Sequence, residues 1–259
     1  RRQLEQQAAD TERQSNLARR QELCEEIEAL ATIDHDQLVA AQARLQAAQH
    51  EWEAIGTTPK SEQRALSQRF ETAIRQFTRH ERFLRQTGSR ETFKQLHARS
   101  RLCARLERLL ALAPVDAGML EQDRKSWEGL PALPEALLEP IQQRFDAAIR
   151  ALTDAPEQAS YLIARLERNL ERKQIWCICM EIAAGVDSPP ECAQQRMQYQ
   201  VARLSASLAS AASKGEGLDD PRLLQEQWCW AGALPAEPES ALDARFLHAL
   251  QAWWQQEEV

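Results

Sequence analysis

Residues 52–70 read WEAIGTTPKSEQRALSQRF, and the same pattern returns as WEGLPALPEALLEPIQQRF at 127–145 and as WCWAGALPAEPESALDARF at 228–246. Each copy begins with Trp, has Gly or Pro four residues later and Pro seven residues later, and ends in Arg-Phe. No copy needs a gap to match the others. Three ungapped copies in one chain indicate an internal repeat, the signature of stacked repeat architectures.

The repeat extends to both sides of these stretches. Three residues after each Phe comes an Ala, and seven residues after it come Phe77, Leu152 and Trp253. This spacing places apolar side chains on one face of a helix. Upstream of each Trp, a Cys is followed four residues later by a Glu; the pairs are Cys24 and Glu28, Cys103 and Glu107, and Cys177 and Glu181.

Each copy therefore predicts three helices. The first helix carries Cys and Glu, at about 1–31, 90–113 and 157–184, the second leads into the Trp, and the third carries Arg-Phe. The Gly/Pro stretch ends the second helix and begins the third. We predict an all-α protein of three tandem three-helix repeat units. An elongated form with coiled-coil-like packing is expected, because such units cover their apolar faces by stacking.

The predicted repeat units span residues 1–88, 89–155 and 156–259. Breaks in the helical pattern at Thr87-Gly88-Ser89 and Asp154-Ala155-Pro156 mark their boundaries. The interval between Cys and Trp is longer in the third repeat than in the other two. This predicts a helical insertion at about 187–220, with an extra helix over 191–213.

Composition agrees with a helical chain. Ala, Leu, Gln, Glu and Arg dominate the 259 residues, and these are strong helix formers. No run of 18 apolar residues appears, which argues against a membrane span, and no signal peptide is visible. We expect a cytoplasmic protein. Because the chain begins at Arg1 inside a helical pattern, we also expect it to be a piece of a longer protein.

The stretch at 52–59 with the following Arg69-Phe70, repeated three times, resembles the bacterial family catalogued as domain of unknown function 349. Residues 176–181, 188–191 and 196–201 resemble the C-terminal unit of its long proteobacterial members. The resemblance implies a helical, cytoplasmic, multi-repeat protein and no particular activity. Pro131 departs from the pattern, since the other copies have Gly56 and Gly232 there, so a left-handed backbone is not required at that position.

The repeated Trp side chains have two interpretations. In the first, Trp52, Trp127 and Trp228 are platforms on which bases or a peptide stack. In the second, each of them packs into the same inter-helix joint, and its indole N–H reaches a loop carbonyl. We favour the joint, because a constant spacing to Phe70, Phe145 and Phe246 is what packing demands.

The repeated arginines also have two interpretations. Arg69, Arg144 and Arg245 either line a groove or pair with the repeated glutamates. We favour the pairs, because the guanidinium fork matches a carboxylate.

Nothing in the sequence predicts a reaction. The six Cys read as buried free thiols, because Cys177 and Cys179 lack a second pair at zinc-ligand spacing. The five His lie at unrelated repeat positions, and there is no phosphate-binding loop or nucleophile elbow. We therefore predict no catalytic residue, metal, cofactor or small-molecule substrate, and a protein that is not an enzyme.

Charge provides the one suggestive feature. The net charge is −7, yet residues 75–108, the basic stretch, hold ten Arg or Lys and three Glu. Phosphate contacts on nucleic acid would use such side chains, and the same face is also suited to an acidic part of a protein. The candidate contacts are Arg75, Arg79, Arg82, Arg85, Arg90, Lys94, Arg99 and Arg101. Trp254 has no place in the repeat and is a further candidate contact for a partner.

These observations favour a binding or scaffold protein that mediates macromolecular interactions in the bacterial cytoplasm, with a protein as its partner. The alternative is a factor associated with RNA, DNA or the ribosome through the basic stretch. Long stacked helical surfaces suit the first, and clustered arginines suit the second.

Overall fold

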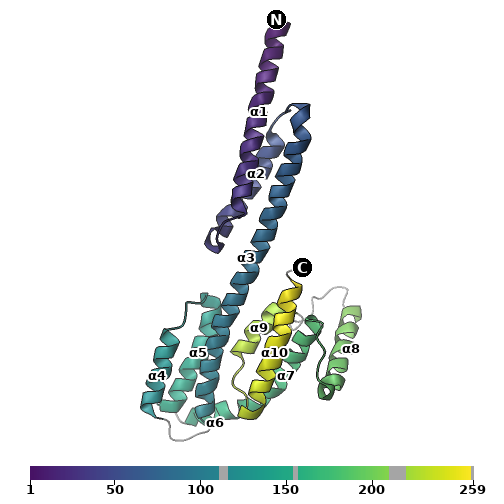
Figure 1. Ribbon diagram of the computed structural model, residues 1–259. Coiled ribbons are helices and arrows are strands. Elements are labelled where there is room, and N and C mark those ends of the chain that lie inside the picture. The colour runs from purple at the N-terminus through teal and green to yellow at the C-terminus, as the bar shows by residue number, and fades with distance from the viewer. Residues whose placement is uncertain (111–115, 154–156, 210–219, 258–259) are drawn as a thin grey trace. The chain divides into compact units, whose positions relative to one another are not determined.

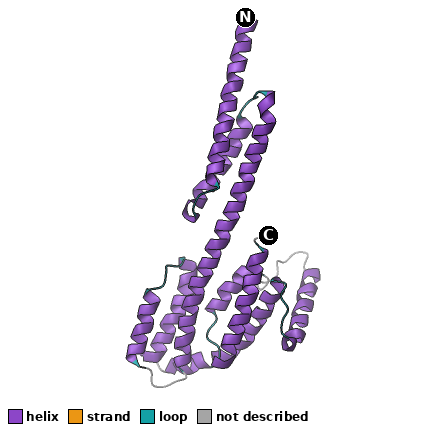
Figure 2. Ribbon diagram, in the orientation of Figure 1, coloured by secondary structure: helices purple, strands orange, loops and turns teal. Residues whose placement is uncertain are grey.

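The computed structural model describes residues 1–110, 116–153, 157–209 and 220–257. Within these ranges the chain forms helices joined by loops, with no strand (Figure 2). The predicted all-α class is confirmed. None of the described helices is long and apolar enough to cross a membrane.

The chain divides into two compact units, Arg1–Ser89 (the N-terminal unit) and Arg90–Val259 (the C-terminal unit). In the N-terminal unit, α1 (Arg2–Leu30) is followed by a 3₁₀ turn (His35–Gln37), α2 (Leu38–Ala54) and the first part of α3 (Lys60–Leu109) (Figure 1). Apolar side chains from all three helices meet in one core. Its buried members are Leu23, Cys24, Ile27, Ala48, Leu66, Phe70 and Ala73.

The C-terminal unit begins with the remainder of α3. It continues with α4 (Ala117–Glu128), α5 (Glu135–Thr153), α6 (Glu157–Ile163), α7 (Arg165–Ala183), α8 (Ala193–Ala209), α9 (Pro221–Trp230) and α10 (Ala236–Gln256). Helix α7 packs against both α9 and α10. One continuous core includes Phe93, Trp127, Phe145, Trp228 and Phe246. The second and third predicted repeats thus share a core, and the boundary predicted at 155 stays a prediction.

The helix ends follow the repeated Gly/Pro stretch. Helices α2, α4 and α9 end at Ala54, Glu128 and Trp230, at most two residues after the repeated Trp. The segment predicted as one helix at 157–184 is two helices, α6 and α7, separated at Ala164. The predicted extra helix is present as a 3₁₀ turn (Pro190–Cys192) and α8. The predicted break at 154–156 lies outside the described residues.

The break predicted at Thr87-Gly88-Ser89 is wrong, because these residues are helical within α3. The His35 ring lies against Gly88, where an added Cβ would come within 2.6 Å of His35 Nε2. Glycine costs about 1 kcal/mol in a helix interior and is kept where a neighbour approaches the backbone closely. Gly88 therefore makes room for His35 instead of ending the helix.

Candidate functional site

The thrice-repeated residues meet at three equivalent places, which we call the first, second and third joint. Their members are Cys24, Glu28, Trp52, Arg69 and Phe70; Cys103, Glu107, Trp127, Arg144 and Phe145; and Cys177, Glu181, Trp228, Arg245 and Phe246. In each joint the Trp ring stacks on the Phe ring. The ring centroids are 3.9, 4.1 and 3.9 Å apart, and the planes differ by 14°, 19° and 7°. Rings in this arrangement are packed against each other, not held open for a base.

Each joint also holds an arginine–glutamate pair. Arg69 donates through Nε and Nη2 to the two oxygens of Glu28, at 2.7 and 2.7 Å. Arg144 binds Glu107 in the same way at 2.6 and 2.9 Å. Arg245 donates to Glu181 at 2.9 to 3.1 Å. The groove-lining alternative is less suited to these arginines, because both prongs of the fork are engaged.

Burial separates the three pairs. The side chains are 40% and 38% exposed in the first joint, 9% and 8% in the second, and 26% and 4% in the third. Burial alone would lower the pKa of Arg144, but the neighbouring Glu107 carboxylate outweighs it and the pKa is raised. Arg144 therefore keeps its charge in the second joint, inside the C-terminal unit.

That pair also links the second joint to the third. Arg144 Nη1 donates to Ser100 Oγ at 3.1 Å and to the Cys229 carbonyl at 2.7 Å. Glu107 Oε2 accepts the Ala233 amide at 2.5 Å. Cys229 lies in the last turn of α9 and Ala233 in the loop that follows it, so one buried ion pair fixes this segment against α3 and α5.

A fourth repeated position completes each joint, and sequence reasoning missed it. Four residues before the Cys lie Arg20, Arg99 and Lys173, each with its charged group over the Trp ring at 4.7, 5.3 and 4.8 Å from the centroid. Arg20 and Arg99 also donate to the carbonyl three residues after the Trp, at 3.1 and 3.3 Å. The signal was a basic residue at one fixed offset in all three copies.

The Gly of the motif leaves space for an asparagine. Asn16 and Asn169 donate to the carbonyls of Thr57 and Ala233, each at 3.1 Å. A Cβ on Gly56 would lie 3.0 Å from Asn16 Nδ2, and one on Gly232 would overlap Asn169 Nδ2. The second copy has Gln95 at the Asn position and Pro131 at the Gly position. The absence of the asparagine explains why Pro131 is tolerated.

We expect Gly232→Ala to destabilise the C-terminal unit by about 1–3 kcal/mol, the typical cost of leaving a buried polar group without its partner. The added methyl group must displace Asn169, which is 4% exposed and bound to Ala233. Urea unfolding measures the change. Gly129→Ala is the matched control, because Gly129 is exposed with φ −76° and its Cβ would lie 3.4 Å from the nearest atom. An equal loss in both variants would rule out this role of Gly232.

The indole N–H groups of the second and third joints do not reach loop carbonyls. Trp127 Nε1 donates to Gln142 Oε1 and Trp228 Nε1 to Asp243 Oδ1, each at 3.0 Å. Both acceptors lie on the helix that follows the motif loop, 15 residues beyond the Trp. The predicted loop acceptor is wrong for these two tryptophans.

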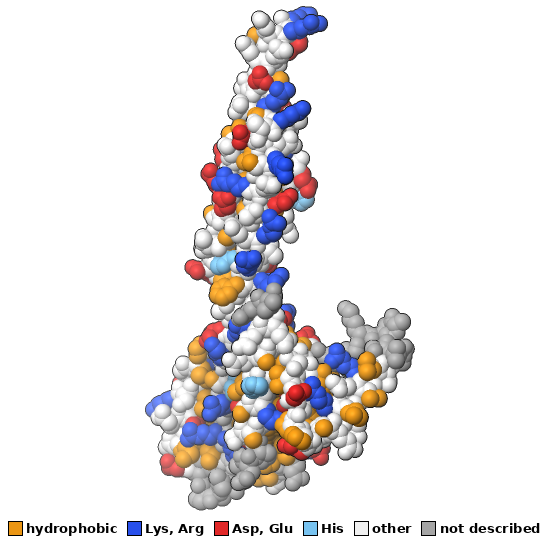
Figure 3. Space-filling model, turned by 45° about the vertical axis from the view of Figure 1, so that its right-hand side comes forward, with side chains coloured by type: hydrophobic (Ala, Val, Ile, Leu, Met, Phe, Trp, Pro, Cys, Tyr) orange, Lys and Arg blue, Asp and Glu red, His pale blue; other side chains and the backbone are white. Residues whose placement is uncertain are grey.

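The basic stretch has two parts in the structure. On the N-terminal unit, Arg75, Arg79, Arg82 and Arg85 are all exposed along α3. Arg85 pairs with Glu81 at 3.1 Å, and Arg75 donates to Thr72. The space-filling view shows basic side chains along the surface of this unit (Figure 3).

On the C-terminal unit the candidate contacts differ from one another. Arg90 donates to the Trp254 carbonyl at 2.7 Å and lies over its ring. Lys94 is exposed and lies 3.7 Å from Glu91. Arg99 is buried beneath Trp127, so its guanidinium does not face a phosphate backbone, and Arg101 is exposed. Of the eight candidate contacts, Arg99 is therefore the buried one, and the use of the others stays a prediction.

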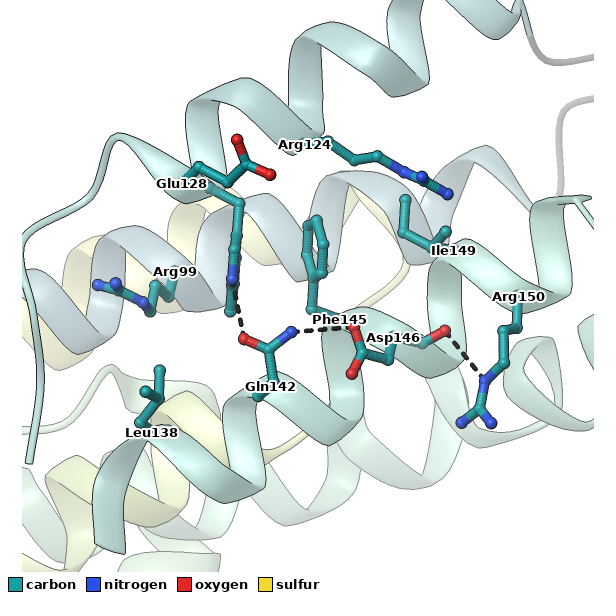
Figure 4. Close-up of a pocket in the computed structure, with 10 residues that line it drawn as sticks. Arg99, Arg124, Glu128, Leu138, Gln142, Phe145, Asp146, Ile149 and Arg150 are labelled. Atoms are coloured by element: carbon teal, nitrogen blue, oxygen red, sulfur yellow. Dashed lines mark hydrogen bonds between the residues drawn. The ribbon is translucent and has the colours of Figure 1, made fainter. Parts of the chain in front are cut away.

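One cavity of the C-terminal unit, about 810 Å³, lies beside the second joint (Figure 4). Gln142 accepts from Trp127 and donates to Asp146 Oδ1 at 2.9 Å, and Arg150 donates to the Asp146 carbonyl at 3.3 Å. The polar groups that α5 contributes to this cavity are thus largely bonded to one another.

A second cavity, about 910 Å³, lies between α3, α7 and α10. His97, Arg101, Arg105 and Arg108 line it from one face of α3. Lys173 lines it from α7, and Glu239 and Asp243 line it from α10.

The cysteines are buried and free, all six of them. Burial raises the pKa of Cys103 and of Cys229 to about 12, which leaves these thiols protonated and poor nucleophiles at neutral pH. Among the described residues, no group of three His, Cys, Asp or Glu is placed to hold a metal ion.

Comparison with family models matches residues 1–61 to the model described as Domain of Unknown Function (DUF349). The matched segment contains Cys24, Glu28, Trp52 and Pro59 of the first copy. Comparisons with curated proteins and with solved structures find no match.

Proposed function

We propose that this chain, which belongs through residues 1–61 to the DUF349 family, is a non-catalytic helical-repeat protein. It would bind macromolecular partners in the bacterial cytoplasm. The description of the family assigns no activity. Three tandem three-helix units would form its framework. The support is the recurrence of one joint at three places, with the same Trp–Phe stack and Arg–Glu pair in each.

The observation that carries this proposal is how the repeated side chains are used. In every joint the Trp stacks on the Phe, and the Arg donates to the Glu. The same side chain at a core position of every copy does not indicate a ligand, because packing alone requires that side chain. Binding is therefore assigned to surfaces that differ between the copies, and the inserted helix α8 is the largest such difference.

Helix α8 presents an apolar face to solvent. Met197, Val201 and Leu204 follow the i, i+4, i+7 spacing of one helix face and are 67%, 56% and 63% exposed. Apolar side chains gathered on an exposed helix are typical of a protein interaction surface. Hydrophobic side chains are visible on the surface of the C-terminal unit in Figure 3. We assign this face to an amphipathic helix of a partner protein, which would dock through its own apolar stripe.

Site-specific cross-linking tests this assignment. Photoreactive benzoylphenylalanine in place of Val201 is expected to give one discrete adduct with a different protein in the native cell. The same group at Gln195, which is exposed on another side of α8, is the matched control and should not give that adduct. An adduct of twice the mass of the chain would show self-association instead, and no adduct at Val201 would count against the face as a binding surface.

Nucleic acid is the second candidate partner, and one observation favours it. Arg75, Arg79 and Arg82 are exposed at i, i+4, i+7 on α3 and form no ion pair with a carboxylate within the described residues. Unpaired arginines on one face are suited to phosphates. Against this candidate, Arg85, Lys94 and Arg99 are each engaged with other side chains.

Charge reversal tests the second candidate. If nucleic acid binds here, Arg79→Glu with Arg82→Glu should weaken binding of labelled RNA by about tenfold or more at low salt and reduce the slope of log affinity against log salt by about 2. The control is Arg13→Glu, an exposed arginine of α1 that already pairs with Asp10 at 2.8 Å. Equal affinity in wild type and both variants would remove this face as a nucleic-acid site.

A further inference from the structure

The third joint departs from the other two at one side chain. Where the first and second joints have Arg20 and Arg99, the third has Lys173. The two arginines lie over the Trp ring and also donate to the carbonyl three residues after it. Lys173 keeps the position over Trp228, with Nζ 4.8 Å from the ring centroid, but makes no hydrogen bond to the equivalent carbonyl of Ala231. The lysine amino group is thus released from the loop.

The Lys173 amino group lies in a buried environment that disfavours its charge. Lys173 is 5% exposed, and it lines the 910 Å³ cavity between α3, α7 and α10. Burial, with Arg144 nearby, lowers the pKa of Lys173 to about 8. Within the described residues it contacts the Trp228 ring and has neither a hydrogen bond nor an ion pair. The Lys173 ammonium contacts the Trp228 ring and is attracted by the Asp243 carboxylate, and an anion entering the cavity would add the hydrogen-bond acceptor that it lacks.

The other charges of the cavity sort into pairs, with one exception. His97 Nε2 lies 3.0 Å from Asp243 Oδ1, and Arg108 pairs with Glu239. Arg105 Nη1 lies 3.4 Å from Asp123 Oδ1. Arg101 lines the cavity from α3 and is exposed, with no ion pair in the described part of the chain. The four Arg and Lys side chains thus outnumber the three carboxylates Asp123, Glu239 and Asp243, so the cavity has an excess of positive charge, and the described residues give Arg101 no ion pair to offset it.

We propose that this cavity binds a phosphate group of a small molecule between Lys173 and Arg101. Lysine offers phosphate a compact point charge and arginine a planar fork of donors. The volume is within the range of small-ligand sites. Trp228 closes the inner side without offering a free face, because Phe246 stacks on one side of the ring and Lys173 lies over the ring. The ligand is therefore held by its charge and not by stacking of a base.

This site is independent of the partner-binding surfaces proposed above. None of Met197, Val201, Leu204, Arg75, Arg79 or Arg82 lines the cavity. A failure of either proposal leaves the other unaffected. Small-molecule binding was not expected from the sequence, because neither Arg101 nor Lys173 belongs to a recognised phosphate-binding motif.

A titration of the whole chain with inorganic phosphate at constant ionic strength tests the proposal. We expect a saturable rise in melting temperature for the wild-type chain. In Lys173→Met and in Arg101→Gln, the phosphate concentration that gives half of this rise should increase at least tenfold. The matched control is Lys125→Met, an exposed lysine of α4 outside the cavity, which should respond like the wild type. Arg101 is at the surface, so Arg101→Gln keeps the test valid if Lys173→Met fails to fold.

Protection from acetylation locates the bound phosphate. Treatment with an N-hydroxysuccinimide acetate and mass spectrometry gives the extent of labelling at each lysine. Phosphate should slow labelling of Lys173 several-fold and leave Lys125 unchanged. Equal protection of both lysines, or the same melting-temperature response in wild type, Lys173→Met and Arg101→Gln, would overturn the proposal.

Discussion

Replacing Arg144 with Met is expected to lower the free energy of unfolding of the C-terminal unit by about 3–5 kcal/mol, the cost of removing one partner of a buried ion pair. Glu107 would remain 7% exposed without its cation. The Cys229 carbonyl and Ser100 Oγ would lose the donor that now reaches them at 2.7 and 3.1 Å. The substitution thus removes contacts to α3 and to the loop after α9 at once.

The same change in the first joint provides the control. Arg69→Met should cost about 0–1 kcal/mol, because an exposed ion pair is well solvated when broken. Its two side chains are 40% and 38% exposed, against 9% and 8% in the second joint. Urea unfolding of the whole chain, followed by probes in each unit, measures both changes. Equal losses at Arg69 and Arg144 would show that burial does not set the strength of these pairs.

Replacing Trp228 with Ala is expected to cost about 3–5 kcal/mol, the typical range for a buried aromatic side chain. Trp228 is 1% exposed and stacks on Phe246 at 3.9 Å. Its indole also donates to Asp243, which accepts from His97 as well. The cavity left behind would open the core shared by the second and third joints.

Trp52→Ala is the matched comparison for Trp228→Ala. Trp52 stacks on Phe70 at the same 3.9 Å but is only partly buried. The loss should be smaller, because the cost of truncation grows with the cavity that remains. Differential scanning calorimetry gives the change for each variant. A larger loss for Trp52→Ala than for Trp228→Ala would contradict the view that the third joint is the more tightly packed.

Sequence spacing alone was enough to favour the pairing of the repeated Arg with the repeated Glu and the packing of the repeated Trp in a joint. The constant intervals from Trp52 to Arg69 and Phe70, and from Cys24 to Glu28, recur in all three copies. A fixed interval between helices means a fixed contact, so pairing of Arg with Glu was predictable. Spacing carries no information on how deeply a side chain is buried. The difference in burial between Arg69 and Arg144 was therefore not predictable.

Single departures from the repeat were harder to interpret. Gly88 suggested a helix break, but its meaning depends on His35, 53 residues earlier in the chain. Arg99 was grouped with the basic stretch by position, although the repeat assigns it to a Trp ring. Lys173 replaces the Arg20 and Arg99 of the other two copies, and its burial beside a cavity could not be predicted from the sequence.

We propose that the repeated joints hold the fold while the exposed face of α8 binds a partner protein. The most direct test is the yield of the Val201 cross-linked adduct in two double variants. Met197→Ser with Leu204→Ser is predicted to abolish the adduct without lowering the melting temperature, because both side chains are more than half exposed. Arg79→Glu with Arg82→Glu is predicted to leave the adduct intact. Loss of the adduct in the arginine variant, with the α8 variant unaffected, would contradict the account and assign binding to the basic face of α3.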